Sequence, residues 1–235
     1  MIEAYVTNFG KYDEGKMYGE YITFPATKEK VKGLLTRIGV DGAKYKDTYI
    51  TEYKSDIEGL SDCLSGHANI DEINYLSSLL AEADEAERAK FEAVINYGDC
   101  TASPKDLINL VKNLDCYDYF PGVENLNGLG RHLILEMGLE EIPERLKPYI
   151  NYHAYGCDFV KSARGGFANG GYVLSGYENM KEQYRGLRDI PGECKVFAYP
   201  GQPEKMPIKK QLEAFSRLAA ESFMPERAEF VREAR

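Results

Sequence analysis

The sequence predicts an α+β fold for an elongated chain of several small domains. Segments rich in β-branched and aromatic residues occur near the N-terminus and again after residue 115, and apolar residues repeat at helical spacing between them. A chain of 235 residues exceeds the commonest size of a single domain. We therefore expect a small α/β domain at 1–60, an acidic helical domain at 61–114, a second α/β domain at 115–176 and a C-terminal extension ending in helices at 177–235.

The first domain is predicted to contain a small sheet and one helix. Apolar residues alternate along residues 2–6, and β-rich runs follow at 21–24 and 48–53, so each segment is predicted to be a strand. Apolar residues at helical spacing follow Thr27, a residue type that caps helices, and they predict a helix between the last two strands. The glycines within residues 8–19 predict a long exposed loop.

The middle domain is predicted to be a cluster of three amphipathic helices. Each helix begins with residue types that cap helix N-termini, and the second ends at a glycine. These residues are Asn69 with Glu72, Asp84 with Glu87, Ser103 with Pro104, and the terminal Gly98. Each helix has one apolar stripe, so we expect the helices to fold by packing against one another and to leave their acids outside.

The third domain and the extension are predicted from shorter signals. Residues 116–120 and 171–174 are β-prone, and a helix ending at Gly138 lies between them. Pro148 suits the start of a further short helix, and Gly156 suits its C-terminal cap. In the extension, apolar residues at helical spacing between Leu212 and Phe223 predict a helix that Pro225 interrupts. We expect this helix to pack back on the body, with contact to a partner or a swapped dimer as the alternative.

Negative charge is concentrated in the middle of the chain. Residues 51–100 contain 12 acidic and three basic residues, and residues 101–150 contain eight acidic and five basic residues. This charge makes nucleic acid an unfavourable partner and a basic protein surface a favourable one. Some of the acids are spaced so that they would form a stripe on the outer face of a helix, where a basic partner could bind them. They are Glu82, Glu85 and Glu92, with Asp84 and Glu87 beside them. The alternative interpretation is an ordinary helix face exposed to solvent.

The five cysteines are irregularly spaced, which argues against a disulfide framework and for reduced thiols. The sequence has no apolar run long enough to span a bilayer and no signal-peptide pattern, so we expect a cytoplasmic protein without a membrane partner. Cys63 with His67 and His153 with Cys157 have a spacing that suits paired ligands or a thiol and its base, but no complete motif surrounds them. We therefore expect no metal, no cofactor and no catalytic centre.

Two segments resemble the ArdA family of antirestriction proteins. The first, YVTNFGKYDEGKMYGEYITFP, matches the family's opening pattern at eight positions and departs from it at Phe9, Asp13 and Tyr21. The second, EIPERLKPYINYHAYGCDF, matches a later family segment, with Asn151 in place of the usual Asp and Cys157 in place of the usual Arg. The resemblance covers about residues 2–176.

The resemblance implies an acidic homodimer that mimics B-DNA. Such a protein occupies the DNA-binding groove of a type I restriction-modification enzyme, in its methylase and specificity core, and thereby protects mobile DNA. Tyr149, Tyr152 and Tyr155 would serve the core and the dimer contact together within 115–176, and packing of their own domain alone is the alternative. The acids expected to stand in for phosphates are Asp62, Asp71, Glu72, Glu82, Asp84, Glu85, Glu87, Glu92, Asp99, Asp115 and Asp118.

Two other classes of function remain open at this point. A regulatory module could use the same acidic surface to bind a different basic protein, and composition does not separate it from an antirestriction protein. A thiol or metal enzyme would use the His and Cys pairs instead.

Overall fold

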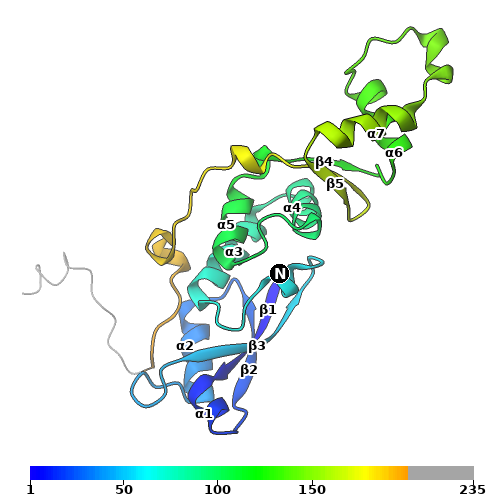
Figure 1. Ribbon diagram of the computed structural model, residues 1–235. Helices are drawn as coiled ribbons and strands as arrows, with labels where there is room; N and C mark the ends of the chain where they lie inside the picture. The colour runs from blue at the N-terminus through cyan, green and yellow to red at the C-terminus, as the bar shows by residue number, and fades with distance from the viewer. Residues whose placement is uncertain (201–235) are drawn as a thin grey trace, which may run out of the picture. The chain divides into compact units, whose positions relative to one another are not determined.

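The first sheet and its helix form as the sequence predicts. The computed structural model describes residues 1–200 (Figure 1). Three antiparallel strands pair in the order β2-β1-β3, and Ile2, Ala4 and Val6 of β1 are at most 1% exposed. Thr27 caps the helix by accepting a hydrogen bond from the Lys30 N–H. The elements are β1 (Ile2–Asn8), β2 (Gly19–Phe24), α2 (Lys28–Ile38) and β3 (Thr48–Ser55).

The predicted loop between the first two strands is partly wrong, because Phe9–Asp13 form the short helix α1. Asn8 is buried at the end of β1, and its side chain accepts a hydrogen bond from the Lys11 N–H at 3.1 Å. Its amide donates to the carbonyls of Ile38 and Gly39 at 3.2 and 2.9 Å. One side chain therefore caps α1 and joins it to the end of α2.

Three helices follow, and most of their predicted caps are confirmed. They are α3 (Ile70–Glu82), α4 (Glu85–Tyr97) and α5 (Pro104–Lys112). The capping box before α4, the left-handed Gly98 after it, and the Ser103 cap of α5 all form. The first cap differs from the prediction, because Asn69 accepts from the Asp71 N–H while the carboxylate of Glu72 binds elsewhere.

A second antiparallel sheet, ordered β4-β6-β5, packs against α4. Strands β4 (Asp118–Pro121) and β6 (Gly171–Leu174) lie at the predicted places, whereas β5 (Gly165–Ala168) was not predicted. A Cβ at Gly165 would lie 2.4 Å from the carbonyl oxygen of Val173, so close pairing requires glycine here. The small residues that permit this pairing carry no β-propensity signal of their own.

Helices α6 (Leu126–Arg131) and α7 (Tyr152–Ser162) cross with their backbones in contact. After α6 the chain makes a π-helical turn at His132–Glu136, and the helical segment ends just before Gly138, which has a positive φ, as predicted. The prediction that Gly156 ends a helix begun at Pro148 is wrong, because Gly156 lies inside α7 and Pro148 lies in the 3-10 segment Glu144–Tyr149. A Cβ at Gly156 would lie 2.2 Å from the Leu126 carbonyl oxygen, so this glycine serves helix packing.

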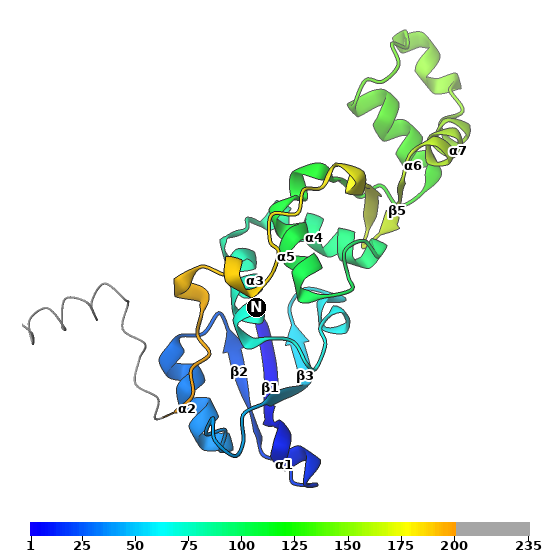
Figure 2. The ribbon, with the colours of Figure 1, turned by 60° about the vertical axis from the view of Figure 1, so that its left-hand side comes forward.

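After the second sheet the chain runs back along α5 and α3 toward the first sheet (Figures 1 and 2). We call residues 177–200 the strap. It contains short 3-10 turns at Tyr177–Asn179, Leu187–Asp189 and Gly192–Cys194. The helix predicted between Leu212 and Phe223 lies outside the described residues.

The buried apolar side chains form two clusters. The larger one includes residues of the first sheet, α2 to α5 and the strap. The smaller one joins β4 and β6 to α6 through Phe120, Val123, Leu129, Leu133 and Tyr172. The division into four domains stays a prediction. Within residues 1–200, none of the helices combines the length and the apolar character that crossing a membrane requires.

Replacing Gly130 by alanine should destabilise the α6–α7 pair. The new Cβ would lie 1.9 Å from the carbonyl oxygen of Tyr152, and backbone cannot yield as a flexible side chain does. We expect the free energy of unfolding, measured in urea, to fall by about 1–3 kcal/mol. Gly128→Ala is the matched control on the same helix, since its Cβ meets nothing nearer than 3.6 Å. Equal unfolding midpoints for the two variants would contradict this packing.

Candidate functional site

The N-terminus of α4 holds three of the predicted acids in solvent. The carboxylate of Asp84 accepts from the Glu87 N–H at 2.8 Å, and the carboxylate of Glu87 accepts from the Asp84 N–H at 3.0 Å. Both side chains and that of Glu85 are exposed. The capping box therefore fixes two carboxylates at the helix end without burying them.

The predicted stripe along a single helix is wrong, because Glu82 ends α3 and Glu85 begins α4. Glu92 lies two turns after Glu85 on α4, but it is half-buried. Its carboxylate accepts a hydrogen bond from the side chain of Asn169 in the turn between β5 and β6. What remains in solvent is the acidic end of α4 together with Glu82.

Asp71 and Glu72, at the start of α3, bind the strap. One oxygen of Asp71 accepts from the N–H groups of Val196 and Phe197 at 2.8 and 2.7 Å. Glu72 accepts from the hydroxyl of Tyr184 at 2.8 Å. These two acids are half-buried and already satisfy donors within the chain. Asp71 and Glu72 were predicted to mimic phosphates, but in the structure they bind donors of the strap.

Asp99 is the most enclosed of the predicted acids, with 9% of the residue exposed. Its carboxylate accepts from Arg164 at 3.1 Å, from the hydroxyl of Ser175 at 2.6 Å and from the hydroxyl of Tyr117 at 3.4 Å. Burial is the main cause that raises the pKa of Tyr117, which keeps this phenol a donor. Asp99 thus joins the end of α4 to the second sheet.

The other predicted acids are exposed and available to a partner. Lys90 donates to the carbonyls of Leu114 and Tyr117 at 3.4 and 2.9 Å, so this cation binds backbone next to Asp115 and Asp118 in the sequence. Among the residues described, the exposed predicted acids that accept no hydrogen bond from nitrogen or oxygen and form no ion pair are Asp62, Glu82, Glu85, Asp115 and Asp118. The prediction missed the exposed Glu58 and Glu124, which lie outside helices and strands, have no helical spacing and are found only by counting charge.

The three predicted contact tyrosines have different environments. Tyr149 is 84% exposed, Tyr155 is half-buried, and Tyr152 is 7% exposed with its hydroxyl donating to the Lys147 carbonyl at 2.9 Å. Tyr152 therefore packs within its own chain and offers little surface to a second one. Three apolar side chains that the prediction did not single out are exposed in the segment before Tyr149: Met137, Leu139 and Leu146.

The cysteines and histidines form one of the two predicted pairs. His153 Nδ1 lies 3.6 Å from Cys157 Sγ, whereas Cys63 donates to the carbonyl of Gly59 and the ring of His67 packs against Tyr49. Burial, followed by the charge of Asp62, raises the pKa of the Cys63 thiol, which opposes thiolate formation. Within residues 1–200, no three His, Cys, Asp or Glu side chains gather in a way that could hold a metal ion.

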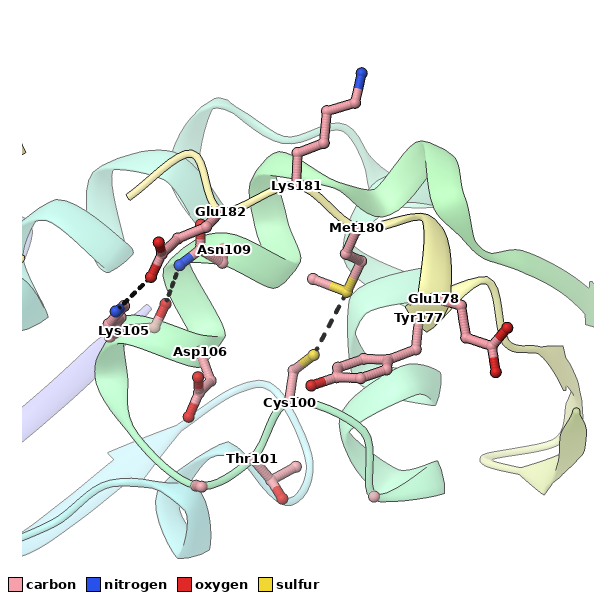
Figure 3. Close-up of a pocket in the computed structure, with 12 residues that line it drawn as sticks. Cys100, Thr101, Lys105, Asp106, Asn109, Tyr177, Glu178, Met180, Lys181 and Glu182 are labelled. Atoms are coloured by element: carbon pink, nitrogen blue, oxygen red, sulfur yellow. Dashed lines mark hydrogen bonds and ion pairs between the residues drawn. The ribbon is translucent and has the colours of Figure 1, made fainter. Parts of the chain in front are cut away.

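A cavity of about 590 Å³ lies between α5 and the start of the strap (Figure 3). Lys105 and Glu182 form an ion pair of 2.6 Å at one side, and Cys100 lies 3.6 Å from the sulfur of Met180 at the other. Burial raises the pKa of the Cys100 thiol. The groups that the Cys100 sulfur contacts are the Tyr117 hydroxyl and the Met180 sulfur, and neither is a base that would activate a nucleophilic thiol.

Replacing Asp99 by alanine should destabilise the fold, because it leaves the buried hydroxyl of Tyr117 and the hydroxyl of Ser175 without their acceptor. We expect the free energy of unfolding to fall by about 1–3 kcal/mol. Asp118→Ala is the control, since it removes an exposed acid that makes no such bond, and should change that free energy little. Urea unfolding with equal losses for the two variants would show that Asp99 does not join these elements.

Comparison with protein families gives a match. A family model described as Antirestriction protein (ArdA) matches residues 4–174. The match includes all of the predicted acids and the three tyrosines, and it ends where the chain leaves β6. No curated protein matches the chain. Because the family match covers well over half of the sequence, the protein belongs to the ArdA family of antirestriction proteins.

Proposed function

We propose that the protein inhibits a type I restriction-modification enzyme by occupying the DNA-binding groove of its methylase and specificity core. Membership of an antirestriction family supports the class of target. The exposed acids Asp62, Glu82, Glu85, Asp115 and Asp118 support the mode of binding, because they lack internal partners among the described residues. Their availability is the observation that carries the proposal.

The physical basis is the source of affinity in a DNA-binding groove. Such a groove gains much of its affinity from Lys and Arg side chains that meet phosphates. Exposed carboxylates on capped helices supply negative charge without the freedom of a flexible tail, so less entropy is lost when they bind. Asp84 and Glu87 are held in this way at the N-terminus of α4.

The amount of charge sets the extent of the mimicry. Residues 51–150 contain 20 acidic and eight basic residues, so two copies would supply about 24 net negative charges. DNA carries roughly one charge per 1.7 Å, and these charges therefore correspond to at most about 40 Å of duplex, because some of the acids bind donors within the chain. Shape and a few well-placed contacts must supply the rest of the affinity for a longer binding groove.

The direct test of this function is restriction in cells. Unmodified phage should plate poorly on cells with a type I system and efficiently when the same cells express this protein. A control strain that lacks the restriction system should plate the phage equally with and without the protein. Unchanged plating on restricting cells that contain the folded protein would contradict the proposal.

Neutralising the exposed acids should weaken binding to a purified type I methylase core. The five changes are Asp62→Asn, Glu82→Gln, Glu85→Gln, Asp115→Asn and Asp118→Asn. We expect affinity to fall by about ten- to a hundredfold, and its dependence on salt to become shallower because fewer ions are released. Binding should be measured at several salt concentrations.

A second variant controls for total charge. It neutralises five exposed acids outside the predicted set and outside residues 51–150: Asp13, Glu29, Asp47, Glu178 and Glu193. If both variants lose the same affinity, net charge alone attracts the enzyme. If neither loses affinity, the predicted acids are an ordinary solvated face.

The protein is further expected to form a homodimer through the exposed segment around Tyr149. Leu146 is 44% exposed and Tyr149 84%, and burying such side chains against a second copy removes apolar surface from water. Light scattering at micromolar concentration should give the mass of a dimer, and Leu146→Glu with Tyr149→Glu should give a monomer. Leu187→Glu, which charges an exposed side chain on the strap, is the control. A monomeric parent protein would contradict this expectation.

A further inference from the structure

The strap is buried although it has little regular secondary structure. Tyr184 is 1% exposed, Ile190 3% and Val196 2%. Irregular backbone leaves N–H and C=O groups unpaired, and burying them is unfavourable unless other groups bind them. The side chains that bind the strap backbone should therefore show how the strap is recognised.

Two asparagines one turn apart at the end of α5 bind the first half of the strap. Asn113 accepts from the Lys181 N–H and donates to the Lys181 carbonyl, both at 3.0 Å. Asn109 accepts from the Tyr184 N–H at 2.9 Å and donates to the Tyr184 carbonyl at 2.8 Å. It also accepts from the Gln183 N–H at 2.9 Å. Figure 3 shows Asn109 on α5 beside this part of the strap. Both asparagines are buried, so they are committed to this contact.

Residues of α3 bind the rest of the strap. Asn74 donates to the Cys194 carbonyl at 3.1 Å and also accepts from the N–H of Ala26, next to the first sheet, at 2.7 Å. Asp71 accepts from the N–H groups of Val196 and Phe197. The hydroxyl of Tyr199 then donates to the Lys46 carbonyl at 3.1 Å, in the segment that leads to β3. The strap thus reaches the first sheet.

The start of the strap is joined to the second sheet. The hydroxyl of Tyr117 lies 3.3 Å from the sulfur of Met180, and the same hydroxyl bonds to Asp99. Arg164, just before β5, pairs with Asp99 and lies over the ring of Tyr177 at 5.0 Å. The segment therefore contacts the second sheet, α5, α3 and the first sheet in turn.

We propose that α3 and α5 form a groove that recognises the strap as an extended peptide, and that docking of the strap there holds the two sheets and the helices in the alignment that presents the acids to the enzyme. This inference rests on the proposed function. The strap lies beyond residues 4–174, so the alignment depends on a segment outside the family match. Asn109 is a positioning residue in this account, because it acts through the strap and lies away from the exposed acids.

The first experiment asks whether Asn109 holds the strap. Asn109→Ala in the full chain should reduce hydrogen-exchange protection by about tenfold or more at the Val196 and Phe197 amides, which Asp71 rather than Asn109 binds, as well as at Gln183 and Tyr184, while the amides of β1 and β3 keep theirs. Asn127→Ala, which changes an exposed asparagine of α6, is the control. Asn113→Ala tests the neighbouring contact if the first variant does not fold. Unchanged protection in both groove variants would overturn recognition by the groove.

The second experiment restores docking without Asn109. The sulfur of Cys194 lies 3.7 Å from the hydroxyl oxygen of Ser78 on α3, so Ser78→Cys places a partner thiol beside it. In the double variant with Asn109→Ala, oxidised glutathione should form a disulfide between the introduced thiol and Cys194, with the two thiol protons and electrons passing to glutathione. The oxidised form should regain protection at the Val196 and Phe197 amides, whose acceptor Asp71 is intact, and the reduced form should not.

Inhibition of a purified type I enzyme then tests the role of docking. The reduced double variant should inhibit about tenfold less well than the parent, and oxidation should restore most of this loss. Equal inhibition by both forms, with the strap released in one of them, would overturn the alignment role and leave the proposed function standing. Failure of the parent protein to inhibit would instead overturn the proposed function.

Discussion

Burying a carboxylate is unfavourable unless hydrogen-bond donors surround it, and this constraint divides the acids of the protein into two groups. Asp99, Asp71 and Glu72 are enclosed and accept from tyrosine, serine, arginine or backbone donors. Those three organise the fold. The second group is exposed and, like Glu85 and Asp118, has no such partners in the described chain, and it defines the surface open to a partner. The exposed Asp84 and Glu87 belong to neither group, because their carboxylates accept only from each other's backbone N–H. Total acidic composition therefore overstates the number of carboxylates that can act as phosphates.

The two groups depend on each other. The enclosed acids join the helices to the second sheet through Asp99 and to the strap through Asp71 and Glu72, and these joints fix where the exposed acids lie. Mimicry of a regular polyanion requires fixed spacing between charges, because a groove of Lys and Arg side chains is complementary to one arrangement. Internal carboxylates that hold the scaffold are thus as necessary to this account as those that face the partner.

Features set by neighbouring residues were predictable from the sequence, and features set by distant contacts were not. The capping box of Asp84 and Glu87 and the cap at Ser103 are local patterns, and both form as predicted. Gly156 has the local features of a helix end, yet it permits the backbone contact between α6 and α7. Asp71 and Asp99 likewise resemble surface acids in sequence, because the groups that bind them lie far away along the chain. The negative charge of the candidate site and the helices that carry it were therefore predictable from the sequence. Which of the carboxylates are free was not.

The most direct test of the central claim is an equilibrium competition between this protein and DNA for one purified type I methylase core. Fluorescent DNA bearing the recognition sequence would be titrated with the protein, and the species present would be resolved by their mass. The account predicts that the protein releases the DNA, that higher DNA concentrations raise the amount of protein needed in proportion, and that enzyme is found with one ligand or the other. A stable complex containing enzyme, DNA and this protein together would contradict binding in the DNA groove.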